Sequence, residues 1–169
     1  RPYAAHPVAV LAVPWIATSV LRRSRGLAAL ARARKVEVFG ARDVHRDPAL
    51  GAIRRFQPDL LLSFSCPYRI EASVLALARL GGLNVHSSLL PAYAGVCTYV
   101  HALAAGETTT GVSLHAMTHE FDAGDIVILE PIAIEPHDTV FSLVTRQCEA
   151  AGAGLAREVP RVRVSGAGP

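Results

Sequence analysis

Short apolar runs alternate with stretches of helical periodicity along most of the chain. The runs are rich in Val, Ile and Leu and are bounded by turn residues, which is typical of buried strands. They predict strands at residues 8–13, 36–39, 60–65, 82–86, 111–117 and 126–134. Apolar positions at helical spacing predict helices at residues 27–34, 48–56, 71–79, 98–105 and 139–155, whereas residues 16–26 fit a helix or a loop. The alternation predicts the α/β class, with a mostly parallel sheet covered by helices.

Length and composition favour one globular domain. The chain has 169 residues, of which 51% are apolar and 18% charged, so disorder and low complexity are excluded. No window reaches about 18 uninterrupted apolar residues, and no membrane span is predicted. We expect one domain over residues 1–160, followed by a flexible tail of Gly, Pro and Arg at residues 161–169.

Charge and cysteine content narrow the partners and the compartment. A net charge of +3 is too small to demand nucleic acid, although the arginine-rich residues 22–25 and 32–35 fit either phosphate contacts or solvated helix faces. Three widely spaced cysteines form neither a disulfide framework nor a CxxC metal clip. A reducing cytoplasm fits this pattern best.

Polar side chains gather where the predicted strand 82–86 ends. Asn84 and His86 are two residues apart, so they project from the same side of the strand, near the carboxyl end where open α/β sheets bind ligands. An amide donor beside an imidazole suits a reaction in which a carbonyl oxygen becomes an oxyanion. Asp122 lies in the turn between the next two predicted strands. If these strands are neighbours, its carboxylate reaches the edge that carries His86.

A resemblance becomes clear at these residues. Asn84-Val85-His86, the following Ser-Leu-Leu-Pro and Tyr-x-Gly, the Thr-Gly-Val-Ser-Leu-His strand and the Phe-Asp-Ala-Gly-Asp-Ile turn resemble the folate-dependent formyltransferase family. Its members include methionyl-tRNA, glycinamide ribonucleotide and sugar N-formyltransferases. The resemblance covers roughly residues 36–155 and implies a Rossmann-like, doubly wound fold. Residues 78–86 and 124–126 favour the methionyl-tRNA and sugar branches over the purine branch.

The resemblance also implies a reaction and a catalytic set. A primary amine would attack the formyl group of 10-formyltetrahydrofolate, giving a tetrahedral intermediate whose oxyanion is held by Asn84 and protonated His86. Asp122 would stabilise the imidazolium and help to relay the proton of the amine. No metal is implied. The acceptor stays open, with tRNA, a sugar nucleotide or another amine as candidates, and so does the oligomeric state.

The predicted donor-binding residues flank this set. Residues 65–70 resemble the pterin-binding loop of the family, and residues 116–125 would close the other side. Loop packing, or contact through main-chain atoms, explains several of these positions equally well. The candidates are Tyr68, Arg69, Ile70, Leu89, Pro91, His119 and Glu120.

Two departures from the family pattern leave other functions open. Ala92 and Ala94 stand where many relatives carry an arginine, which weakens the case for a phosphate-rich acceptor. The family's opening strand is not evident before residues 8–13, so the first βα unit is predicted to be missing unless residues 8–34 replace it. The alternatives are a sugar N-formyltransferase, a formyltetrahydrofolate hydrolase and a non-catalytic folate-binding or regulatory module. A metallohydrolase would use His115, His119, Glu120, Asp122 and Asp125.

Overall fold

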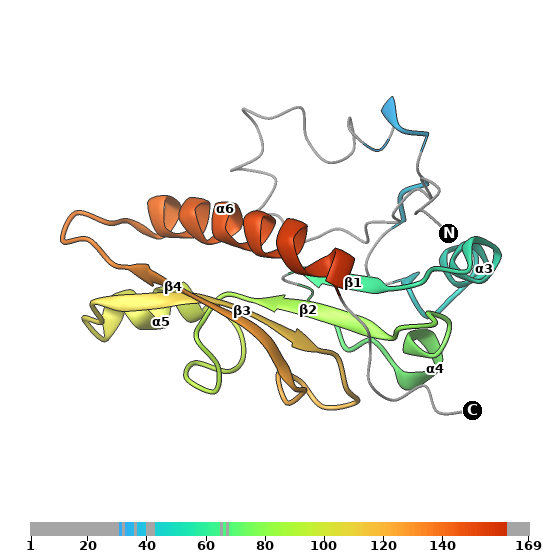
Figure 1. Ribbon diagram of the computed structural model, residues 1–169, viewed down its shortest axis with the longest axis horizontal. Helices are drawn as coiled ribbons and strands as arrows, with labels where there is room; N and C mark the ends of the chain where they lie inside the picture. Colours follow the sequence, from blue (N-terminus) through green and yellow to red (C-terminus); the bar gives the residue numbers. More distant parts are fainter. Residues whose placement is uncertain are drawn as a thin grey trace.

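The structure of the chain is a computed structural model that describes residues 31, 33–35, 37–39, 43–64, 66 and 68–161 (Figure 1). The predicted elements at residues 8–13 and 16–26 lie outside these residues, as does most of the predicted helix 27–34. The first βα unit and the tail at 161–169 therefore remain sequence-based expectations, apart from Arg161.

In the part of the chain that the structure describes, four strands form one sheet in the order β1-β2-β3-β4 (Figure 1). They are β1 (Leu61–Phe64), β2 (Gly82–His86), β3 (Thr109–Ala116) and β4 (Ile126–Ala133), close to the predicted ranges. The α/β class is confirmed, but the described sheet is mixed: β1 and β2 are parallel, whereas β3 is antiparallel to both β2 and β4. Residues 117–125 join β3 to β4, and a parallel crossover needs about a dozen residues or more.

The helices are α3 (Ala49–Phe56), α4 (Ala72–Leu75), α5 (Thr98–Ala104) and α6 (Val140–Glu158), with a 3-10 turn at Val159–Arg161. The predicted helix 71–79 is helical only in its first half. Beyond α4, the N–H groups of Arg79 and Leu80 bond to the carbonyls of Pro58 and Asp59, which draws the chain away from a helical path. Residues 37–39 of the predicted strand 36–39 have no regular secondary structure. None of the helices described here has the length and apolar content needed to cross a membrane.

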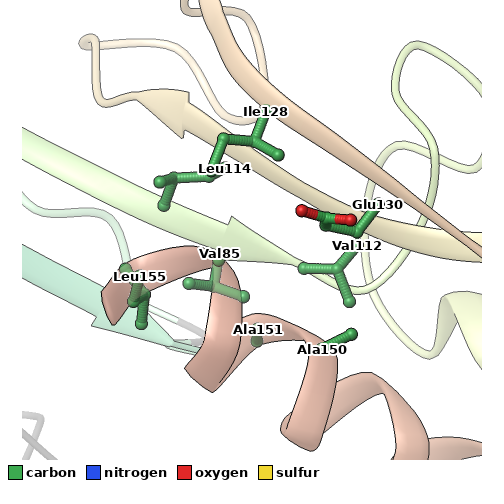
Figure 2. A pocket seen from close by; sticks show the side chains of 9 residues that line it. Val85, Val112, Leu114, Ile128, Glu130, Ala150, Ala151 and Leu155 are labelled. Carbon is green, nitrogen blue, oxygen red and sulfur yellow. The ribbon is translucent and has the colours of Figure 1, made fainter. Parts of the chain in front are cut away.

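Among the described residues, two apolar clusters form the core. One joins α3, α4 and β1, and it contains Val44, Ile53, Leu61, Ile70, Val74, Leu75 and Ala78. The other lies between the sheet and α6, which crosses one face of the sheet (Figure 1). In this second cluster Ala150 and Ala151 of α6 face Val85, Val112 and Leu114 of the strands (Figure 2). The small helix residues allow α6 to lie close to β2 and β3.

β4 is the last strand of the described sheet, and its two faces differ. Ile128 and Ile132 pack against the cluster beneath α6, whereas Val127 and Leu129 are exposed. Pro131 stands opposite Gly111 on β3. The Ile134 N–H donates to the Thr108 carbonyl, so residues 108 and 134 form a hydrogen-bonded pair. Hydrogen-bonded and non-hydrogen-bonded pairs alternate along an antiparallel ladder, and Gly111 and Pro131 form a pair of the second kind. The nitrogen of Pro131 therefore faces away from β3.

The cap at the start of α6 gives a test of how this helix is stabilised. Thr139 caps the helix: its side chain accepts a hydrogen bond from the Ser142 N–H, and the Ser142 hydroxyl accepts one from the Thr139 N–H. Thr139→Ala is expected to lower the free energy of unfolding by about 1 kcal/mol. Urea unfolding followed by circular dichroism measures this loss. Thr145→Ala is the matched control, because it lies inside the helix, where Ala is favoured; equal losses in both variants would contradict the prediction.

Candidate active site

Asn84 and His86 lie on the same side of β2, as the strand alternation predicts. The antiparallel register places Asn84 opposite His115 and His86 opposite Ser113 on β3. Asn84 is half-buried, and its Nδ2 lies 3.1 Å from Nε2 of His115. The amide therefore points into a polar cluster and not into packed hydrocarbon.

Asp122 reaches this cluster from the β3–β4 turn. Oδ1 of Asp122 lies 3.3 Å from Nδ1 of His86 and 3.6 Å from Nε2 of His115. Its φ of 53° is in the left-handed region, which Asp adopts more readily than most residues. The other carboxylate oxygen accepts a hydrogen bond of 2.9 Å from the Gly95 N–H. The structure thus brings together the three residues that the sequence marks as candidates for catalysis.

Both ring nitrogens of His86 face oxygen atoms. Nε2 lies 2.9 Å from the carbonyl oxygen of Tyr93, which only accepts hydrogen bonds, so Nε2 carries a hydrogen. A neutral ring would then direct the lone pair of Nδ1 at the Asp122 carboxylate, whereas an imidazolium donates on both sides. The side chains of His86 and Asp122 are only 7% and 10% exposed. The carboxylate and the imidazole therefore face each other in a largely enclosed site.

His115 belongs to this cluster, although the sequence did not place it in the catalytic set. It is 2% exposed, and its Nδ1 lies 2.9 Å from the Ala116 carbonyl, so Nδ1 carries a hydrogen. In the neutral ring Nε2 is then an acceptor for the amide of Asn84. The available signal was the spacing of Ser113 and His115, which repeats that of Asn84 and His86. The spacing alone does not predict a contact; the register of β2 and β3 places His115 opposite Asn84.

The loop after β2 supplies the acceptor for His86. Tyr93 has a φ of 54°, and its carbonyl turns back toward the His86 ring. The Tyr93 hydroxyl donates a hydrogen bond of 2.6 Å to Glu107, and this bond raises the pKa of the Tyr93 phenol. The side chain of Tyr93 is therefore held outside the cluster, whereas its backbone carbonyl contacts the His86 ring.

The two predicted walls of the donor site lie next to each other. The guanidinium carbon of Arg69 lies 5.8 Å from the ring centre of Phe121, the residue before Asp122. Tyr68 is partly exposed, whereas the side chain of Ile70 is buried in the first core cluster. Only main-chain atoms of Ile70 can therefore meet a ligand.

The remaining candidates are divided between packing and the surface. Leu89 packs against Gly111, and Pro91 is exposed at the tip of the loop. The exposed side chains of His119 and Glu120 lie 3.6 Å from each other. Within the described ranges, no three His, Cys, Asp or Glu side chains are placed to hold a metal ion.

Comparison with known proteins places the chain in a family. The model of the formyl transferase family matches residues 12–159. Because this match spans most of the sequence, the chain belongs to the formyl transferase family.

Solved structures with the same fold are found among formyltransferases. The phosphoribosylglycinamide formyltransferase of Anaplasma phagocytophilum matches at 24% identity with a TM-score of 0.69, over 82% of this chain and 68% of its own. The Bacillus halodurans enzyme of the same name matches at 22% identity and 0.61, over 70% and 65%. A Mycobacterium tuberculosis protein proposed as a sugar N-formyltransferase matches at 23% and 0.61, over 81% and 61%. These similarities establish a Rossmann-like fold, and the chain spans less than two thirds of the length of the last two proteins.

A close backbone contact holds the Asp122 turn and gives a second test. A Cβ atom on Gly124 would lie 1.8 Å from the Ala116 carbonyl oxygen, a backbone atom that cannot move aside. Gly124→Ala is expected to lower the free energy of unfolding by about 1–3 kcal/mol and to displace Asp122. Chemical denaturation measures the first effect, and the NMR signals of the His86 ring report the second.

Gly152→Ala is the matched control for this test. Gly152 lies on α6 with nothing within 4 Å of an added Cβ, so alanine is expected to stabilise the helix by up to about 1 kcal/mol. A Gly124→Ala variant as stable as the wild type would show that the turn does not depend on this contact.

Proposed function

We propose that this chain transfers the formyl group of 10-formyltetrahydrofolate to a primary amine. The observation that carries the proposal is the contact of 3.3 Å between Asp122 and His86, beside Asn84, in a chain of the formyl transferase family. We assign the activity to residues 1–160 and expect residues 161–169 to be a tail. A cytoplasmic location remains an expectation from the cysteine content.

Asn84 is the residue that we assign to the oxyanion. Its amide nitrogen carries two hydrogens, and the contact with His115 uses one of them. The second is available to an oxygen that gains negative charge when the amine attacks the formyl carbon. Because the neutral His115 ring accepts from Nδ2, it keeps the NH₂ group of Asn84 in place. We therefore assign His115 a positioning role.

His86 and Asp122 handle charge and protons. As the new carbon–nitrogen bond forms, the carbonyl electron pair moves to oxygen, and the imidazolium stabilises that charge. The attacking amine must lose a proton, and the folate nitrogen must gain one when its bond to carbon breaks. We assign this transfer to Asp122, through water. The N–H groups of His86 are already directed to Tyr93 and Asp122, so its part is mainly electrostatic.

The donor is assigned to the walls on either side of Asp122. The contact between Arg69 and Phe121 supports a site formed jointly by residues 68–70 and 119–122. Leu89 and Pro91 are the candidates beside the formyl group, and His119 and Glu120 are candidates at the outer edge.

The acceptor is a primary amine of a small molecule in our proposal. The structures named above act, by their names, on phosphoribosylglycinamide or are proposed to act on a sugar, and this gives no particular support to the methionyl-tRNA branch. The neutral Ala92 and Ala94 argue against a tRNA, which is rich in phosphates, more than against a small acceptor with few phosphates. Phosphoribosylglycinamide and amino-sugar nucleotides are therefore the first acceptors to test.

Charge removal in the Asp122 turn tests the proposal directly. Asp122→Asn is expected to lower kcat/KM by about 10²- to 10⁴-fold. The variant removes the carboxylate that faces the His86 ring and that accepts the proton of the attacking amine. Asn84→Ala is expected to lower kcat by about 10²- to 10³-fold. The absorbance change on release of tetrahydrofolate measures both. Asp125→Asn, an exposed carboxylate in the same turn, is the matched control and is expected to keep wild-type activity.

The same assay separates the alternatives. Consumption of the donor without any added amine would indicate the hydrolase, and binding of the donor without turnover would indicate the regulatory module. Equal activity of Asp122→Asn and Asp125→Asn would contradict the catalytic assignment.

A further inference from the structure

Gln147 joins three elements through one nitrogen atom. It lies in the middle of α6 and is only 2% exposed. Its Nε2 donates to the carbonyl oxygen of Ser87 at 3.0 Å and to that of Gly111 at 3.1 Å. The helix, the loop after β2 and the strand β3 therefore meet on this amide.

These two carbonyls lie where the sheet opens. β2 ends at His86, which lies opposite Ser113. β3 already begins at Thr109, so its first residues extend past the end of β2. Continuing the register by two residues would pair Ser88 with Gly111. The chain leaves the sheet at Ser87, and Gln147 supplies a donor to Gly111 at the place where a longer β2 would supply one.

Two sets of hydrogen bonds, joined by the peptide between Ser87 and Ser88, link Gln147 to His86. The carbonyl of Ser87 also accepts a hydrogen bond from the Thr98 hydroxyl. The Ser88 hydroxyl donates to the carbonyl of Ala92 at 2.7 Å and to that of Tyr93 at 3.2 Å. The carbonyl of Tyr93 is the acceptor for Nε2 of His86. The peptide between Ser87 and Ser88 therefore links Gln147 to the partner of His86.

The other end of the Gln147 amide is not explained by packing. Oε1 is buried and has no hydrogen-bond partner among the residues that the structure describes. A buried oxygen without a partner lowers stability, and an apolar side chain of similar shape, such as Met, would avoid that cost. The two hydrogen bonds from Nε2 are what a glutamine offers here and a methionine does not.

We propose that Gln147 is a positioning residue for the active site. By holding the Ser87 peptide it keeps the Tyr93 carbonyl, and with it the imidazole of His86, in the arrangement that faces Asp122. The kinetic part of this inference rests on the proposed formyl transfer. The placement of the His86 ring does not, because it is measured in the protein alone.

The test is Gln147→Met in the full chain. We expect kcat for formyl transfer to fall by between about 10- and 100-fold, since small displacements of a catalytic group have effects of this size. KM for 10-formyltetrahydrofolate should be unchanged. Tm should be equal to or below that of the wild type, because the loss of two donors outweighs the relief of one unpaired oxygen. In ¹⁵N-labelled protein the imidazole Nε2–H signal of His86 should shift or broaden.

Two further variants keep the test decisive. Ala151→Gly, one turn further along the same face of α6, lies in the apolar cluster; it should lower Tm and leave both kcat and the His86 signal unchanged. Thr98→Val removes the other donor to the Ser87 carbonyl and should act in the same direction as Gln147→Met. It carries the test if Gln147→Met does not fold.

The outcomes are distinct. Wild-type kcat and a wild-type His86 signal in both Gln147→Met and Thr98→Val would overturn the inference. An equal fall in kcat and an equal change of the His86 signal in Ala151→Gly would overturn it too, because any loss of stability would then suffice. If the wild type transfers no formyl group, the proposed function fails, and the His86 signal alone decides whether Gln147 positions the ring.

Discussion

The polar cluster of Asn84, His86, His115 and Asp122 depends on one enclosed carboxylate, which lies beside both imidazole rings. A carboxylate as enclosed as that of Asp122 requires hydrogen-bond partners, and it lies beside the Gly95 N–H and two imidazole rings. His86 has oxygen atoms at both ring nitrogens, whereas Nε2 of His115 lies against the amide nitrogen of Asn84. A single side chain thus contacts both rings and, through His115, is linked to the amide of Asn84.

The mixed sheet makes this arrangement possible. Because β3 runs antiparallel to β2, Ala116 at the end of β3 lies beside Leu83 at the start of β2. The following turn folds back along the sheet, held by the close approach of Gly124 to β3, until Asp122 reaches His86. The loop after β2 arrives from the opposite direction with Tyr93 and Gly95. Two connections that lie far apart in sequence therefore close on the same pair of strands.

Much of this molecule could be predicted from local patterns, and the exceptions share a cause. Strands and helices with clear periodicity were placed within a few residues, and the Asn84, His86 and Asp122 set followed from spacing and family motifs. The direction of β3 relative to β2 was missed: the short β3–β4 connection makes only those two strands antiparallel to each other, and the segment between β2 and β3 is long enough for a parallel crossover. His115 and Gln147 were missed because their partners depend on strand register and on a helix far along the chain. The shortened α4 reflects hydrogen bonds to residues 58 and 59, which helical periodicity cannot reveal.

The proline in β4 has a consequence for how this molecule meets its neighbours. A strand at the border of a sheet is a template on which another chain can assemble through main-chain bonds. With Val127 and Leu129 exposed, β4 would otherwise invite such assembly. The ring nitrogen of Pro131 faces outward from β3, so an added strand would find an interrupted row of donors in the middle of the border. Pro131 thus makes this border of the described sheet a poorer template for an added strand.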